Sequence, residues 1–306
     1  APISADDHRP FSATGDVFLA EATLGTIRVY RATFTSPEGF ALNGDGMTVE
    51  AECDLYDIDA QGTLYFGDVS FRGPLNISGT VRDERTALNL GGARCSSEIN
   101  LDGEFAGEYS VDCSVLTVEG SIGLLSGFVS RGLFRMETSQ VGGSLVIYRG
   151  AQFRFAPVAP AASSLASENQ TSPQESVVNG DLVVDDTSSD VGMESSSTST
   201  ETPNAGETIR WTRTTIGGRI ALAFVDENQG HNSSANPTVI EGEVHLDNMV
   251  VNENVSFAHV HFEPGVKVHL DGIKIGKQLI LGHTDGHDDA ETSHQHVTRP
   301  AEISLR

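Results

Sequence analysis

Regularly spaced histidines near the carboxyl-terminal end are the residues whose type and spacing best suit chemistry. His245 and His269 are 24 residues apart, and His259 and His283 have the same separation. If equivalent strands stack about 4.8 Å apart, the members of each pair lie side by side. Neighbouring imidazoles are good ligands for a divalent transition metal. Asp285 or His287 is a further candidate ligand, and His261 is expected to point outward from the same strand as His259.

A second interpretation of these histidines needs no metal. They can form a solvated polar face whose members repel one another once protonated near about pH 6. Sequence spacing fixes neither the rotamers nor the groups that would orient a ligand. The polar face is therefore the preferred interpretation, a metal site at His245, His269, His259 and His283 is the alternative, and no other cofactor is expected.

Acidic residues are the other candidates for chemistry. Some β-helical proteins cleave polysaccharides with paired carboxylates and a basic residue on one face, and carboxylates also bind Ca²⁺. A solvated acidic turn is the preferred interpretation here, because sequence spacing does not establish a carboxylate pair. The candidates are Asp54, Asp57, Asp59, Asp68 and Arg72.

The sequence contains no nucleotide-binding glycine loop, no GxSxG, no HExxH and no arrangement typical of a nucleophilic enzyme. We therefore expect a protein that is not an enzyme. The formal net charge is −24, which argues against binding to nucleic acid or to an anionic membrane. Such charge favours solubility, and an acidic solenoid that mimics DNA and inhibits a DNA-binding enzyme is an alternative. No apolar run is long enough to insert into a membrane.

Apolar pairs recur along the chain at steps of about 22–24 residues, which organises the whole sequence. Alternation within each short run indicates strands with one side chain inward and the next outward. The pattern predicts an all-β, right-handed parallel β-solenoid with glycine or polar residues at the corners. One series runs through Phe40/Leu42, Leu64/Phe66 and Leu88/Leu90, and another through Val29, Cys53, Ile77 and Leu101.

The carboxyl-terminal part shows the same period. Ile220, Val244 and Val268 are each 24 residues apart, Ile216 matches Ile240 by the same step, and VHLD occurs twice. In the amino-terminal part the same step predicts an outward row of Arg28, Glu52, Asn76 and Asn100. Within that row, Asn76 and Asn100 are expected to form an amide ladder.

Composition divides the chain into two solenoid segments and two polar stretches. The amino-terminal array covers residues 1–156, and the carboxyl-terminal array covers 208–282. Residues 157–207 form a Ser-, Thr-, Glu- and Pro-rich linker that we expect to be disordered, and 283–306 form a His-rich polar tail. The spacing leaves open whether the arrays stack on one another. Cys53 and Cys113 fall at inward positions, where small buried hydrophobes are expected.

Three stretches of the amino-terminal array carry a recognisable repeat: TSPEGFALNGDGMTVEAECDLYD, TALNLGGARCSSEINLDGEFAG and VGGSLVIYRGAQF. They resemble the glycine-rich ALNLxGA tandem repeats common in actinomycete bacteria, over about residues 34–155. The pattern is similar, more generally, to β-solenoids such as pentapeptide-repeat proteins and bactofilins. The resemblance implies a solenoid fold and no catalytic residue. The carboxyl-terminal array departs from it, with His in place of small polar residues.

These observations together predict a non-enzymatic β-solenoid that acts as a structural or interaction protein. Its partner is expected to be another protein or a second copy, because open solenoid ends expose strand edges. A polysaccharide-binding or polysaccharide-cleaving β-helix is the alternative from another class. The compartment is unknown, and a secreted or cell-surface location is favoured.

Overall fold

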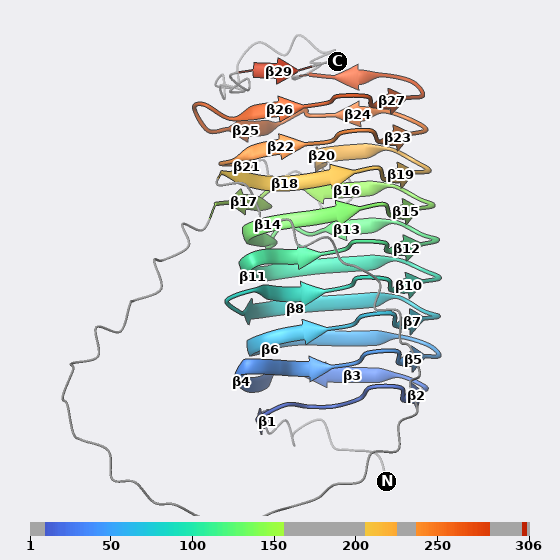
Figure 1. The fold of residues 1–306 in the computed structure, drawn as a ribbon, viewed down its shortest axis with the longest axis vertical. Coiled ribbons are helices and arrows are strands. Elements are labelled where there is room, and N and C mark those ends of the chain that lie inside the picture. The colour runs from blue at the N-terminus through green and yellow to red at the C-terminus, as the bar shows by residue number, and fades with distance from the viewer. Residues whose placement is uncertain (1–9, 156–205, 225–236, 282–301, 305–306) are drawn as a thin grey trace, which may run out of the picture. The chain divides into compact units, whose positions relative to one another are not determined.

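A computed structural model describes residues 10–155, 206–224, 237–281 and 302–304. Every secondary-structure element in these ranges is a β-strand, and the sheet pairings between them are parallel. The strands stack coil upon coil from β1 to β29 (Figure 1). A nine-stranded sheet contributes one short strand to each coil. The predicted all-β parallel solenoid is therefore confirmed, with about nine turns.

Each full coil contains four strand segments, and equivalent segments stack into four ladders. The short ladder consists of β2 (Thr23–Leu24), β5 (Thr48–Val49), β7 (Ser70–Phe71), β10 (Arg94–Cys95), β12 (Thr117–Val118), β15 (Gln140–Val141), β19 (Thr215–Ile216), β23 (Val250–Val251) and β27 (Lys274–Ile275). The first ladder consists of β3 (Ile27–Tyr30), the start of β6 (Cys53–Tyr65), β8 (Leu75–Arg82) and the start of β11 (Ile99–Asp112), then β13 (Ile122–Leu124), β16 (Leu145–Tyr148), β20 (Ile220–Phe224), β24 (Val255–Ser256) and β28 (Leu279–Ile280).

The two remaining ladders follow along each coil and share its longest strands. The second ladder consists of β1 (Phe11–Thr14), the start of β4 (Ala32–Asn43), the middle of β6 and β11, the end of β8, the start of β14 (Val129–Glu137), then β17 (Gln152–Arg154), β21 (Thr238–Ile240) and β25 (Val260–Phe262). The third ladder consists of the ends of β4, β6, β11 and β14 together with β9 (Thr86–Asn89), β18 (Glu207–Thr212), β22 (Glu243–His245), β26 (Lys267–His269) and β29 (Glu302–Ser304).

Inward side chains of each ladder form apolar columns that make up one continuous core. In the third ladder one column passes through both predicted arrays, and its members from Leu42 to Val268 are buried. Each buried Leu, Ile, Val or Phe contributes about 1.5–3 kcal/mol of transfer free energy. The column contains Leu42, Leu64, Leu88, Val111, Phe134, Ile209, Val244, Val268 and Ile303.

Corners between the third ladder and the short ladder need a left-handed backbone. One residue per turn has a φ between 51° and 72° there, and only three of the nine are glycine. The row is Glu21, Gly46, Asp68, Gly92, Val115, Thr138, Arg213, Asn248 and Gly272. Gly103 has a different role, because it allows a close approach between neighbouring coils. It pairs with Gly79 where β11 passes from the first ladder to the second, and a Cβ there would lie 2.0 Å from the carbonyl oxygen of Gly79. The expectation of glycine or polar residues at the corners holds except at Val115.

The two arrays stack directly on one another. Strand β14 pairs with β18, and β16 pairs with β20, so residues before position 156 continue in parallel register into residues after 206. The described residues on both sides of the linker belong to one compact unit. Because β17 and β18 are successive segments of one coil, the predicted linker 157–207 is an insertion within that coil. Its last two residues are described, with Glu207 beginning β18, and residues 157–205 lie outside the described residues.

Several predicted registers are wrong by an even number of residues. Val29 pairs with Leu55, and Cys53 pairs with Ile27. Leu42 pairs with Leu64, so the first step of that series is 22 residues rather than 24. A slip of two keeps inward residues inward because side chains alternate with a period of two. The alternation therefore predicted the inward side of these strands but not every pairing partner.

The carboxyl-terminal register is wrong for a different reason. Ile220 pairs with Val255, not with Val244, and Ile216 pairs with Val251, not with Ile240. Residues 225–236 lengthen this coil, so the step across it is 35 residues. The predicted match of Val244 with Val268 is correct. Within the predicted polar tail, residues 302–304 form β29 and pair with β26.

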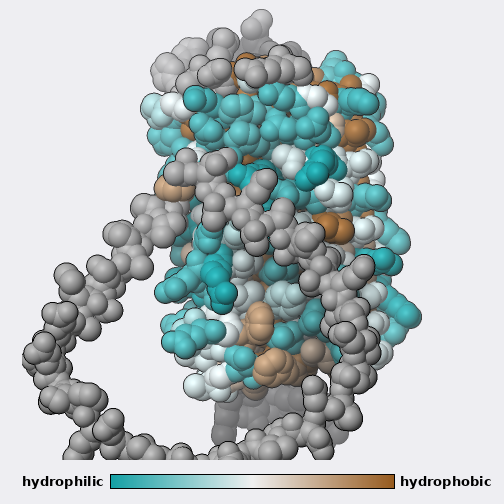
Figure 2. Space-filling model, viewed as in Figure 1, coloured by the Kyte–Doolittle hydropathy of each residue, from teal (hydrophilic) through white to brown (hydrophobic). Residues whose placement is uncertain are grey.

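Outward positions carry polar side chains, and the face shown in Figure 2 is mostly hydrophilic over the described coils. The predicted amide ladder is present: Asn100 Nδ2 donates to Asn76 Oδ1 at 3.0 Å. It extends one coil further, because Asn76 Nδ2 donates to Asp54 Oδ1 at 2.8 Å. Asp54 thus occupies the place in the row that the 24-residue step gave to Glu52.

Candidate functional site

The repeated VHLD motif places His245 and His269 on neighbouring strands. Val244 pairs with Val268 and His245 with His269 in the third ladder. Both valines are buried in the core, so alternation turns both histidines outward. Their ring centroids are 4.2 Å apart, and the ring planes differ by 6°. The predicted juxtaposition of this pair is confirmed.

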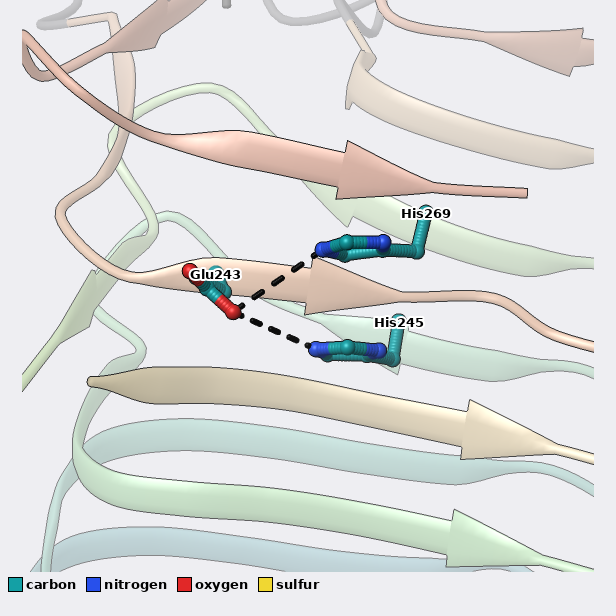
Figure 3. A group of neighbouring side chains, drawn as sticks. All are labelled: Glu243, His245 and His269. Carbon is teal, nitrogen blue, oxygen red and sulfur yellow. Dashed lines mark ion pairs between the residues drawn. The ribbon is translucent and has the colours of Figure 1, made fainter. Parts of the chain in front are cut away.

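Glu243 completes a cluster of three side chains that the sequence analysis did not find. It lies two residues before His245 on β22, and its Oε2 is 3.5 Å from His245 Nε2 and 3.8 Å from His269 Nε2. Figure 3 shows both imidazole edges directed at the same carboxylate oxygen. Glu243 could have been predicted from the sequence, because the side chains of residues two apart on a strand lie on the same face of the sheet. Among the described residues, Glu243, His245 and His269 form the one group of three His, Cys, Asp or Glu side chains close enough to hold a metal ion.

The aspartates of the two VHLD motifs, Asp247 and Asp271, connect the cluster to neighbouring groups. Asp247 Oδ2 lies 3.3 Å from His245 Nδ1, so that nitrogen is suited to carry the ring proton. Asp247 Oδ1 accepts a hydrogen bond from the backbone N–H of Asp271 at 3.0 Å. Asp271 Oδ1 in turn accepts one from Ser304 Oγ at 3.1 Å. The cluster is thereby connected to the last strand, β29.

The histidine row continues into permanently charged residues on earlier coils. Ladder pairing joins Arg135 to Arg210 and Arg210 to His245. Arg210 is buried and ion-paired with the buried Glu207. Glu207 Oε1 also lies 3.4 Å from His245 Nε2. Negative charge therefore surrounds His245 on three sides: from Glu207, Glu243 and Asp247.

Of the second predicted histidine pair, only His259 is described, and it is not part of this cluster. His259 lies between β24 and β25 with a φ of 60°, which makes it a corner residue. His261 pairs across the second ladder with Val239 and has its Nε2 3.5 Å from Glu263. His283, Asp285 and His287 lie outside the described residues.

The acidic candidates for polysaccharide chemistry do not converge in the described part of the chain. Asp54 is buried and accepts a hydrogen bond from Asn76, and Asp59 lies 3.8 Å from Arg82 Nη1. Arg72 is ion-paired with Glu50. The two others, Asp57 and Asp68, are residues with positive φ. Each candidate thus has a local structural role.

The two ends of the described stack differ from its middle. Inward hydrophobic residues that are only partly buried against the core occur in the first and last coils. Three aromatic side chains of the first coil are more than half exposed, Phe11, Phe18 and Tyr30, and so is Leu281 in the last. The partly buried residues are Ala13, Val17, Leu19, Ala22, Leu24 and Val29 at one end and Ile273, Ile275, Leu279 and Ile303 at the other.

All three cysteines are free and buried. The inward placement predicted for Cys53 and Cys113 is confirmed, and Cys95 is also buried, with its thiol 3.4 Å from the carbonyl oxygen of Gly73. Burial raises the pKa of Cys53 to about 12, and it also raises the pKa values of Cys113 and Cys95. These thiols are core side chains rather than nucleophiles.

Comparison with known proteins found no match among protein-family models, curated proteins or solved structures. In the described residues, no helix is long and apolar enough to cross a membrane.

Proposed function

We propose that the protein is a non-enzymatic β-solenoid that serves as a structural or interaction protein and associates end to end with copies of itself. The two ends support this proposal. Strands β1, β2 and β3 each pair with one described strand only, and so do β25, β27 and β28 at the other end. An unpaired strand edge is a template for pairing with another chain.

The two ends are complementary because they terminate the same ladders. If the first coil of a second copy followed the last coil of the first, all strands would keep one direction. Leu24 of the second copy would then follow Ile275 in the short-ladder column, and both are only partly buried in a single copy. Such a contact joins two different surfaces, so it repeats without closing.

Charge is distributed so that the ends can approach one another. The chain carries a net charge of −24, yet its three lysines, Lys267, Lys274 and Lys277, all lie in the last two coils. In the first coil, Arg28 and Arg31 balance the charges of Asp16 and Glu21. Contact between the two ends therefore meets less like-charge repulsion than contact between the acidic sides.

Sedimentation velocity across a wide concentration range tests the proposal. The wild type is expected to form species larger than a dimer as concentration rises. Val29→Asp blocks the first coil and Leu281→Asp blocks the last, so each variant alone is expected to remain monomeric. An equimolar mixture of the two has one intact end of each kind and is expected to form a dimer and nothing larger.

Matched controls keep the test decisive. Thr215→Asp adds the same charge at an exposed outward position in the middle of the short ladder and is expected to associate like the wild type. Tyr30→Asp, at an already exposed position, replaces Val29→Asp if that variant loses its β spectrum. A wild type that stays monomeric would mean that edge residues such as Lys274 protect the ends, and one that stops at a dimer would mean that like ends meet. Either result overturns the proposal.

A further inference from the structure

We propose that Glu243, His245 and His269 bind one divalent transition-metal ion on the outer side of the third ladder. The first argument concerns lone pairs. Nε2 of both histidines is buried and has no hydrogen-bond partner. In neutral imidazole with the proton on Nδ1, each Nε2 directs a lone pair toward Oε2 of Glu243, at 3.5 and 3.8 Å. In that tautomer three electron-pair donors face one another, and a cation between them relieves their repulsion.

The distances suit a transition metal. Zn²⁺ binds His nitrogen and carboxylate oxygen at about 2.0–2.2 Å, which places neighbouring ligand atoms of a tetrahedral ion about 3.3–3.6 Å apart. The two separations between Glu243 Oε2 and the histidine Nε2 atoms, 3.5 and 3.8 Å, are close to this range. Two imidazoles and one carboxylate suit Zn²⁺, Ni²⁺, Cu²⁺ or Fe²⁺, whereas Mg²⁺ and Ca²⁺ prefer oxygen ligands.

The surroundings hold the ligands in place. His245 and His269 lie on neighbouring strands of one ladder, so hydrogen bonds between coils fix their spacing. Asp247 lies 3.3 Å from Nδ1 of His245. A carboxylate on that nitrogen selects the tautomer that leaves Nε2 free for a metal and raises its basicity.

A bound proton is the competing explanation. The row that contains these histidines also contains Arg135 and Arg210, so two imidazolium rings would continue a column of cations neutralised by carboxylates. The parallel stack at 4.2 Å argues against two charged rings, because like charges at that distance repel. A single metal ion shared by neutral rings removes the repulsion and uses Glu243 as its counter-charge.

Titration of the full-length chain with ZnCl₂ and NiCl₂ by calorimetry near neutral pH tests this inference. The wild type is expected to show one saturable site that the double variant His245→Ala/His269→Ala lacks, whatever other histidines contribute. Glu243→Gln keeps the shape but removes the anionic ligand, and it is expected to weaken that site at least tenfold. Asp247→Asn is expected to weaken it by about 10–100-fold, because it acts through the orientation of His245.

His261→Ala is the matched control, since His261 also lies beside a glutamate on a stacked strand but belongs to no group of three described side chains close enough to hold a metal ion. Its isotherm is expected to match that of the wild type. Thermal unfolding supplies a second readout, because an ion that binds only the folded chain raises Tm. This rise should be smaller in Glu243→Gln and absent in the double variant. An isotherm that is unchanged in the double variant, or no saturable binding by the wild type, overturns the inference in favour of the protonated pair.

Discussion

Asp112 and Arg135 lie on successive coils and form a buried ion pair with two contacts. Arg135 Nε is 3.2 Å from Asp112 Oδ1, and Nη2 is 2.5 Å from Oδ2. Both side chains are 8% exposed. The guanidinium carbon also lies 4.5 Å from the centroid of the Tyr109 ring. An outward row of this solenoid therefore contains buried positions, and charged residues there depend on their partners in the next coil.

We expect Arg135→Met to destabilise the protein by about 3–5 kcal/mol, because it leaves the Asp112 carboxylate buried without its counter-charge. The double variant Asp112→Leu/Arg135→Met removes both charges and is expected to recover most of that loss. Urea unfolding of the wild type, both single variants and the double variant measures the coupling. Additive effects of the two substitutions would show that the charges do not depend on each other.

Leu101 and Asn100 test which side of β11 faces the core. Leu101 is 1% exposed, so Leu101→Asp is expected to cost at least about 4 kcal/mol through a buried, unpaired charge. Asn100 faces outward and donates one hydrogen bond to Asn76. Asn100→Asp is therefore expected to cost only about 1 kcal/mol. Equal losses of unfolding free energy at the two positions would contradict the observed orientation of this strand.

These two neighbours also show what the sequence could predict. Alternation of apolar and polar residues was enough to predict the fold, the inward side of each strand and the Asn76–Asn100 ladder, because these depend only on a period of two and a regular coil length. It could not predict that Val29 pairs with Leu55 or that Ile220 pairs with Val255. The Val29 pairing was missed because a two-residue shift in register leaves the alternation of inward and outward residues intact. The Ile220 pairing was missed because the extra residues in its coil, 225–236, are about half a coil long. A 24-residue step then ends on a strand of a different ladder that has the same apolar pattern.

The candidate site was predictable to a similar extent. The 24-residue step correctly paired His245 with His269, since no residues are inserted between them. It did not predict Glu243, because a search for residues one coil apart overlooks a ligand two positions away on the same strand. The second pair was predicted by the same spacing, but His259 occupies a corner. Spacing alone does not distinguish a strand position from a corner.

Val115 is the one apolar side chain in the left-handed corner row. It has a φ of 60° and is 60% exposed, so it adds strain without filling the core. A left-handed backbone costs a residue with a Cβ about 1–2 kcal/mol, whereas Asn tolerates it better. We expect Val115→Asn to stabilise the protein by about 1 kcal/mol in urea unfolding. Thr48→Asn, on an unstrained strand, is the control and should not stabilise.

The buried cysteines predict a loss of stability at alkaline pH. Burial raises the pKa of Cys53 to about 12, and that of Cys113 also lies well above its ordinary value. Unfolded thiols titrate near about pH 8.5. Above that pH the unfolded chain releases protons that the folded chain retains, so the equilibrium moves toward unfolding. The expected loss approaches about 1.4 kcal/mol per pH unit for each such cysteine.

Urea unfolding between about pH 8 and 9.5 measures this slope, a range that starts below the ordinary thiol pKa and ends above it. Cys113→Ala is expected to be less stable at neutral pH, because it leaves a small cavity, yet to lose less stability as the pH rises. The native chain should also resist alkylation by iodoacetamide at pH values where the urea-unfolded chain reacts. A slope that is identical in wild type and Cys113→Ala, or rapid alkylation of the native chain, would mean that these thiols are not held in the core.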